Sequence, residues 1–388
     1  MEQGTTRPFR FTNVSLANWR NFGHIEVKLH RRVFVVGPNA AGKSNFLDVF
    51  RFLHDIVSVG RGFEQAVASR GGVSGLRSLS ARRYSDVVIS VAVGFDERSS
   101  IWEYELAFNQ DNNQRPVIRK ERVVFNGAPL LERPNASDEA DPEQLTQTYL
   151  QQVNVNKEFR PVAEFFGTVK YLHVVPQLVR EPERSVGRKD DPYGGDFLEQ
   201  IARTTERTQV SRLNRIREAL QVAVPQLESL ELKRDDIRGT PHLRGRYRHW
   251  RPQGAWQSED QFSDGTLRLL GLLWATLDGT GPLLLEEPEL SLHPEVVRYL
   301  PLMFARIQRR SGRQIMASTH SSDLLREGVG MNEVVLLQPS EEGTTAKTAG
   351  DLEDVRDLLE GGINLAEIVM PKTRPAHAEQ LTFFGDQG

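Results

Sequence analysis

The chain has 388 residues and a formal net charge of −3, with 26% charged and 38% hydrophobic residues, a composition typical of one large or two small globular domains. This charge excludes a polycation, so any contact with nucleic acid must come from a local basic face. The chain has no cysteine, which excludes disulfides, thiolate metal sites and cysteine nucleophiles. Residues 1–10 lack the apolar core of a secretory signal, and the longest apolar stretch is too short for a membrane span. We therefore expect a cytoplasmic protein with no membrane partner.

The N-terminal half begins with a strand, a glycine-rich turn and a helix. A β-branched and aromatic run predicts the strand over residues 33–36, and apolar residues at helical spacing predict the helix over 45–53. Three further runs separated by polar turns predict an antiparallel β-meander over 87–95, 101–108 and 117–125. A polar stretch rich in Pro, Asn, Asp and Glu predicts a loop over 126–144.

The C-terminal half alternates strands and helices, which favours an α/β fold. The predicted strands cover residues 171–175, 242–250, 282–286 and 314–318, and the predicted helices cover 197–224, 264–277 and 295–309. We expect a single head over residues 1–370. Its core is formed by 8–56 and 255–370, a lobe of β-structure and helices is inserted at 57–254, and a tail follows at 371–388.

Residues 37–44 match the P-loop pattern G-x-x-x-x-G-K-[ST] between the first strand and helix. Glycines at this turn let backbone N–H groups surround phosphates, and the helix N-terminus adds its dipole. Lys43 is expected to reach the β- and γ-phosphates, and the Ser44 hydroxyl is expected to bind Mg²⁺. The predicted nucleotide-binding residues here are Gly37, Asn39, Ala40, Ala41, Gly42, Lys43, Ser44 and Asn45.

Two acids, Glu286 and Glu287, end the buried strand over 282–286. A strand of this kind delivers carboxylates to the phosphate end of a sheet. Glu286 is expected to hold Mg²⁺, directly or through water, and Glu287 to polarise the attacking water. Without the P-loop the same pair would predict only a solvated turn.

Two further motifs flank the acidic strand. Ser263 and Gly265 lie at the start of the helix before it, where a helix N-terminus forms an anion site, although Ser-Asp-Gly is also a common turn. His320 follows the next strand, where a γ-phosphate sensor would lie, although a lone histidine is often structural.

The order P-loop, signature, acidic strand and histidine resembles the ABC-type ATPases, and within them the SMC, RecF and OLD group of heads. The wording of residues 286–294 (EEPELSLHP) and 318–321 (STHS) is close to that group's Walker B, D-loop and H-loop, and residues 16–22 (LANWRNF) resemble its N-terminal opening. The resemblance covers almost the whole chain. It implies an ABC-type P-loop head with a mixed sheet, an antiparallel β-meander and an inserted helical lobe.

The resemblance also implies a mechanism in which ATP is bound with Mg²⁺ between two heads that pack head-to-tail. Ser263 and Gly265 would then contact the γ-phosphate in trans, with Glu287 as catalytic base and His320 as switch histidine. Gln177 is similar in position to the Q-loop residue, a nucleotide and metal ligand, but a plain polar turn explains it equally well. Asn18 and Arg20 either line the nucleotide or are structural.

The sequence departs from this pattern in two places. Glu286 stands where Asp is usual, which adds a methylene and puts the metal distance in doubt. Asp264 and Thr266 replace a Gly and a Gln or Glu of the signature. A carboxylate near a triphosphate weakens the closure of two heads around ATP unless it points away.

DNA is the usual ligand of this group. Arg244, Arg246 and Arg248 alternate along a predicted strand, followed by His249, Trp250 and Arg251, and this face either contacts a phosphate backbone or is merely solvated. No nuclease motif follows His320. We therefore expect an ATPase that acts as a DNA-linked sensor or regulator of a separate effector protein, by analogy with OLD-like heads paired with TOPRIM-type nucleases in phage defence. The alternatives are a RecF-like repair ATPase and a nucleotide-locked scaffold.

The tail ends in a short apolar segment that contains Phe383 and Phe384. Two phenylalanines near a chain end are costly to leave in water. They either dock on the head or bind a partner, since residues 380–384 resemble the short peptide that bacterial proteins insert into the sliding clamp.

Overall fold

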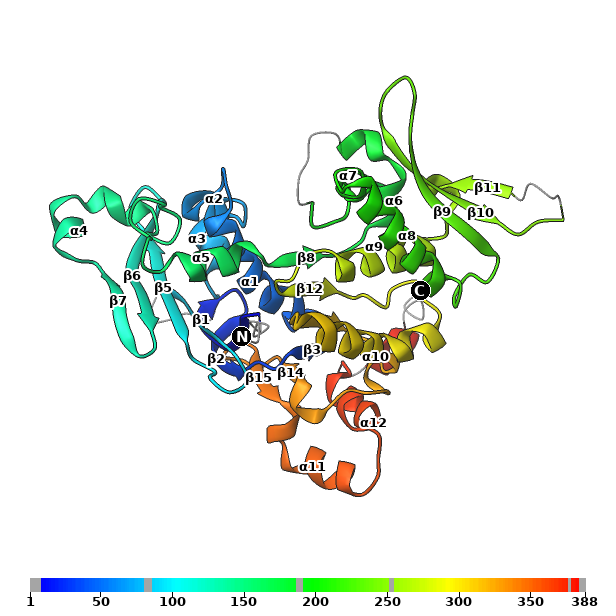
Figure 1. The fold of residues 1–388 in the computed structure, drawn as a ribbon. Coiled ribbons are helices and arrows are strands. Elements are labelled where there is room, and N and C mark those ends of the chain that lie inside the picture. The colour runs from blue at the N-terminus through cyan, green and yellow to red at the C-terminus, as the bar shows by residue number, and fades with distance from the viewer. Residues whose placement is uncertain (1–7, 80–85, 186–190, 251–254, 376–377, 384–388) are drawn as a thin grey trace, which may run out of the picture.

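The computed structural model describes residues 8–79, 86–185, 191–250, 255–375 and 378–383. A central sheet separates an antiparallel sheet on one side from a helical layer and a smaller sheet on the other (Figure 1). Within the described ranges, no helix has the length and apolarity needed to cross a membrane.

In the described residues the central sheet has six strands in the order β15-β14-β3-β13-β12-β8, parallel except for β15. The strands are β3 (Arg32–Val36), β8 (Lys170–Leu172), β12 (Leu283–Glu286), β13 (Ile315–Thr319), β14 (Val334–Gln338) and β15 (Thr345–Thr348). Successive side chains enter two different hydrophobic clusters, with Val33 and Val35 on one face and Phe34 and Val36 on the other. Burial on both faces explains the continuous apolar runs that predicted β3, β12 and β13, whereas β14 and β15 were not predicted.

The first face carries α1 (Lys43–Val57) and an antiparallel sheet in the order β2-β1-β4-β5-β6-β7. Its strands are β1 (Arg10–Trp19), β2 (Phe22–Lys28), β4 (Val87–Gly94), β5 (Trp102–Gln110), β6 (Pro116–Phe125) and β7 (Ala128–Arg133). The short helices on this side are α2 (Phe63–Ala68), α3 (Gly72–Leu76), α4 (Ala136–Ala140) and α5 (Arg160–Gly167). The predicted β-meander is confirmed, and it pairs directly with β1 of the core.

The loop predicted over 126–144 is wrong, because this segment contains β7 and α4. Arg133 at the end of β7 is fully buried and pairs with Glu121 at 2.9 Å and Asp138 at 2.6 Å. Arg133 and Asp138 are buried as an ion pair in a segment that is otherwise largely exposed, so its polar composition hid a strand and a helix.

The second face carries helices and a three-stranded antiparallel sheet, β11-β10-β9. The helices are α6 (Pro176–Arg180), α7 (Phe197–Ala202), α8 (Glu206–Leu220), α9 (Asp264–Leu277), α10 (Pro294–Ser311), α11 (Glu353–Glu360) and α12 (Leu365–Val369). The strands are β9 (Leu227–Arg234), β10 (Pro241–Tyr247) and β11 (Ala255–Ser258). Two predictions need correction, because the helix over 197–224 is two helices and the strand over 242–250 ends at Tyr247.

The tail contains a short 3-10 helix, η8 (Ala378–Phe383), after η7 (Met370–Thr373) at its start. Phe383 is 63% exposed, so docking of this ring on the head is not what the structure has. Phe384 lies outside the described residues.

Candidate functional site: a nucleotide cradle at the ends of β3, β12 and β13

The P-loop connects β3 to α1, as the sequence predicts. Ala40 and Gly42 adopt left-handed φ values of 62° and 94°, which turn the loop back toward the helix N-terminus. Lys43 Nζ donates to the carbonyls of Gly37 and Pro38, each at 3.0 Å. Burial lowers the pKa of Lys43, and nearby carboxylates, chiefly Glu287, oppose this shift. The ammonium group is therefore held inside the cradle, while Ser44 at its rim is exposed.

Asn21 supports the P-loop from the turn between β1 and β2. Its Nδ2 donates to the Ala41 carbonyl at 2.8 Å, and its Oδ1 accepts from Asn45 Nδ2 at 2.8 Å. A Cβ at position 42 would lie 2.2 Å from the Asn21 amide, so Gly42 is also required by this contact. The sequence prediction missed Asn21, although it lies in the N-terminal motif.

The two neighbours of Asn21 that the sequence did single out lie elsewhere. Asn18 donates to the Asp86 carbonyl at 2.9 Å, and Arg20 pairs with Asp48 at 3.1 Å. These contacts favour the structural alternative for Asn18, whereas Arg20 lines the cavity beside Ser44.

Glu286 ends β12 directly beside Ser44. Ser44 Oγ donates to one oxygen of the Glu286 carboxylate, and the hydroxyl of Tyr171 donates to the other. Burial raises the pKa of Glu286, and the Ser44 hydrogen bond opposes this shift. A hydroxyl beside a carboxylate at a phosphate cradle is the hard oxygen set that Mg²⁺ takes together with phosphate oxygens and water, so the residues present fit that ion.

Glu287 turns away from the sheet in a left-handed conformation with φ of 45°. Non-glycine residues rarely adopt this conformation outside sites where the surrounding structure enforces it. Its Oε1 lies 3.4 Å from Nε2 of His320, which follows β13. Burial and the charge of Lys43 lower the pKa of His320, while Glu287 opposes the shift, so the imidazole is neutral near pH 7. The predicted acid and histidine therefore lie together.

Glu289 is a buried residue of this site that the sequence prediction missed. Its Oε1 accepts from Thr319 Oγ1 at 2.5 Å and from the His320 backbone N–H at 3.2 Å. It thereby fixes the segment after β12 to the end of β13, the strand that carries the histidine. Its place two residues after Glu287 was the available signal.

The signature segment lies at the N-terminus of α9. Ser263 caps the helix by accepting from the Thr266 N–H at 3.2 Å, and a Cβ at Gly265 would lie 2.4 Å from the Ser291 carbonyl oxygen. Asp264 points to Arg180, with 2.6 Å between Oδ1 and Nη2. Ser263 and Gly265 are not brought to the cavity beside Ser44 and Glu286.

Gln177 is exposed on α6, and the structure does not bring it to the other predicted ligands. The strand before it, β8, ends at Leu172 rather than at residue 175, so Gln177 lies five residues beyond the sheet edge. Tyr171 and His173 lie at this edge instead, and His173 Nδ1 is 3.3 Å from the Glu286 carbonyl oxygen.

A cavity of about 430 Å³ opens beside Ser44 and Glu286. Its lining comes from the turn after β1, from α1, from the segment between α2 and α3, from β8 and the segment that follows it, and from the end of β12. The lining residues include Arg20, Ser44, Asp48, Arg70, Tyr171, His173 and Glu286.

Comparison with known proteins agrees with this geometry. A family model described as "AAA domain, putative AbiEii toxin, Type IV TA system" matches residues 32–326. No curated protein matches the chain.

Solved structures with a similar fold are SMC heads. One is a head bound to the C-winged helix domain of ScpA (12% identity, 89% of this chain and 99% of that chain, TM-score 0.51). Two others are the Smc heads of Pyrococcus furiosus (11% identity, 91% and 99%, TM-score 0.51) and Pyrococcus yayanosii (9% identity, 92% and 100%, TM-score 0.50). The predicted α/β head fold is confirmed.

Proposed function

Because the chain belongs to the AAA-domain family whose model matches residues 32–326 and has an SMC/RecF-like ABC-type head, we propose that it clamps ATP between two copies of itself and hydrolyses it. The observation that carries the proposal is the meeting of Lys43, after β3, with Glu286 and Glu287, at the end of β12, while His320 follows β13 between these strands and lies beside Glu287. Lys43 and the P-loop amides bind the phosphates, and Ser44 and Glu286 hold Mg²⁺, which neutralises phosphate charge when bound.

Glu287 orients the attacking water and takes its proton at the carboxylate. The neutral imidazole of His320 donates a hydrogen bond toward either Glu287 or the γ-phosphate. Its lowered pKa keeps a second positive charge from competing with Lys43 for the same carboxylates.

The proposed dimer is supported by the position of the signature residues, which lie away from the cavity beside Ser44 and Glu286 in the same copy. Ser263 is exposed where it caps α9, and Gly265 lies against Ser291, so we infer that the signature serves the nucleotide of a second molecule. Asp264 is turned to Arg180, which reduces the repulsion that its charge would exert on a triphosphate.

Glu287→Gln tests the proposal, because the amide keeps the shape of the side chain but cannot take a proton. We expect ATP binding to persist, hydrolysis to fall about 10²–10⁴-fold, and a dimer to accumulate with ATP and Mg²⁺. Size-exclusion chromatography with light scattering and phosphate release measure this. Near-normal turnover in the variant rules out the assignment of Glu287.

We further propose that the nucleotide state of this head, in the cytoplasm, controls a separate effector. The family description names a toxin of a type IV toxin–antitoxin system, which favours a role in a two-component system over general repair. Hydrolysis stimulated by DNA supports a DNA-linked sensor, and its absence favours the scaffold alternative. A neighbouring gene for a nuclease separates the effector model from the RecF-like one.

A further inference from the structure

The hydroxyl of Tyr171 reaches the carboxylate of Glu286, which the proposed function assigns to the metal. It comes from β8, the edge strand beside β12, and it pairs in register with Leu284, two residues before Glu286. Side chains two residues apart on a strand share a face, so Tyr171, Leu284 and Glu286 all project toward α1. The Tyr171 hydroxyl donates to the Glu286 oxygen that Ser44 does not occupy.

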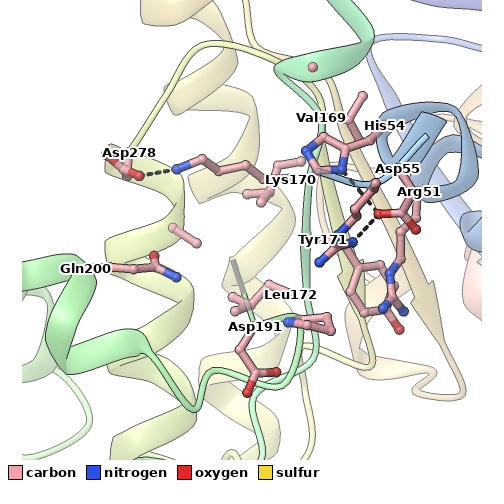
Figure 2. A pocket seen from close by; sticks show the side chains of 15 residues that line it. Arg51, His54, Asp55, Val169, Lys170, Tyr171, Leu172, Asp191, Gln200 and Asp278 are labelled. Carbon is pink, nitrogen blue, oxygen red and sulfur yellow. Dashed lines mark hydrogen bonds and ion pairs between the residues drawn. The ribbon is translucent and has the colours of Figure 1, made fainter. Parts of the chain in front are cut away.

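The ring of Tyr171 also contacts Arg51 of α1. The guanidinium carbon of Arg51 lies 5.1 Å from the ring centroid. Figure 2 shows Arg51 and Tyr171 next to each other at one wall of a neighbouring cavity, opposite the Lys170–Asp278 ion pair. Because Arg51 and the strand both restrain the ring, its hydroxyl is a fixed donor rather than a mobile one.

A fixed donor has a specific use at Glu286. Compared with the Asp expected in this motif, glutamate has one more rotatable bond, so its carboxylate has more positions to lose when it binds a metal. Ser44 and Tyr171 each donate to one of its oxygens, which leaves the carboxylate a single orientation. Tyr171 supplies the second of these hydrogen bonds. Gln177, which the sequence predicted as a metal ligand, is exposed on α6 instead.

We propose that Tyr171 is a positioning residue for the metal site. Its hydroxyl holds the carboxylate of Glu286 in place, a support that the shorter side chain of Asp would not need. The inference rests on the proposed function, because it assigns Tyr171 to the same Mg²⁺ site. It predicts that the Tyr171 hydroxyl matters for metal affinity and hardly for the affinity of the nucleotide itself.

Tyr171→Phe removes the hydroxyl and keeps the ring against Arg51. Fluorescent ATP-analogue titrations in EDTA are expected to match the wild type, because Lys43 and the P-loop are untouched. Binding of Mn²⁺ to the protein–nucleotide complex, followed by electron paramagnetic resonance, is expected to weaken about tenfold, the effect of losing one hydrogen bond to a charged group. Tyr193→Phe is the matched control, since Tyr193 lines the same cavity and no bond from it to Glu286 is found among the described residues.

A double-mutant cycle separates positioning from general damage. In a Glu286→Asp background the shorter carboxylate is withdrawn from Tyr171, so adding Tyr171→Phe should change Mn²⁺ affinity less than twofold. The proposal is overturned if Tyr171→Phe lowers Mn²⁺ affinity equally in both backgrounds. It is also overturned if the variant loses nucleotide binding in EDTA together with metal binding. If the wild type binds no nucleotide, the proposed function itself fails. If the wild type binds it normally and Tyr171→Phe keeps full Mn²⁺ affinity, only the role of Tyr171 is rejected.

Discussion

At the scale of single residues, Glu289 gives the site a pH-dependent stability. Burial raises the pKa of this carboxyl group above its ordinary 4.5, although two hydrogen bonds to its Oε1 oppose the shift. A group with a raised folded-state pKa contributes stability that is present below the unfolded pKa and is lost as pH rises through the folded pKa. The free energy of unfolding of the wild type should therefore fall as pH rises from about 4.5 through the raised pKa of Glu289.

Glu289→Gln removes the charge and keeps an oxygen for Thr319 and His320. We expect its unfolding free energy to decline less than that of the wild type as pH rises, so that the variant gains relative stability toward pH 8. Urea unfolding at a series of pH values from 4.5 to 8 measures this. Parallel stability profiles for the two proteins would contradict it.

Motif residues could be predicted from sequence because their spacing along the chain sets their geometry. Lys43 and Ser44 follow from the P-loop, and Glu287 and His320 follow from the ends of two adjacent strands. The supporting residues Asn21, Tyr171 and Glu289 could not be predicted in the same way. Their roles depend on partners from other elements, such as Asn45 for Asn21 and Thr319 for Glu289. Gln177 was singled out by proximity to a strand whose end lay three residues earlier than predicted.

At the scale of elements, the start of α9 is fitted closely to the segment after β12. A Cβ at position 265 would approach the Ser291 carbonyl oxygen to 2.4 Å, and backbone at that distance has to move. Gly265→Ala should destabilise the protein by about 1–3 kcal/mol. Thermal unfolding measures this, with Gly330→Ala as control, since a Cβ there meets only the Glu333 side chain at 3.6 Å. Equal melting temperatures for the two variants would show that the backbone at Ser291 moves to accommodate the added Cβ without loss of stability.

The basic face on β10 is smaller than the sequence suggested. Arg244 and Arg246 point outward from β10, but Arg248 follows the end of the strand, and Arg251 lies outside the described residues. Glu228 pairs with both Arg246 at 3.4 Å and Arg248 at 3.5 Å, which neutralises part of the charge.

Changing Arg244, Arg246 and Arg248 together to Glu should weaken DNA binding and flatten its salt dependence, because fewer phosphate contacts release fewer counterions. Binding titrations at several salt concentrations measure both. The control changes Arg306, Arg309 and Arg310 on α10 to Glu, with the same change in net charge. If both triple variants lose affinity equally, the effect belongs to net charge and not to this face.

The strands β3, β12 and β13 of the central sheet were predictable because burial on both faces leaves a continuous apolar run, but β14 and β15 of the same sheet were missed. The prediction failed where charges are buried in pairs, as around Arg133 in β7, and where a helical pattern continues across a break, as between α7 and α8. It also missed β1 and β2, which pair with each other and place Asn21 against the P-loop.

At the scale of the whole molecule, the cradle and the signature belong to different parts of one copy. Lys43 and Glu287 lie at the carboxyl edge of the central sheet, whereas Ser263 caps α9 and contacts Thr266. This separation is what the proposed head-to-tail packing of two heads requires. The proposed boundaries of core, insertion and tail are less clear-cut in three dimensions, because β4 and β8 from the insertion pair with β1 and β12 of the core.

Complementation between two inactive variants tests the shared site most directly. Lys43→Ala removes the cradle and Ser263→Arg blocks the signature, so each homodimer has two defective sites, while a mixed dimer keeps one intact site. We predict that the equimolar mixture hydrolyses ATP measurably above either variant alone and at a fraction of the wild-type rate. A mixture no faster than its components, measured where the wild type is active, would contradict head-to-tail clamping of ATP.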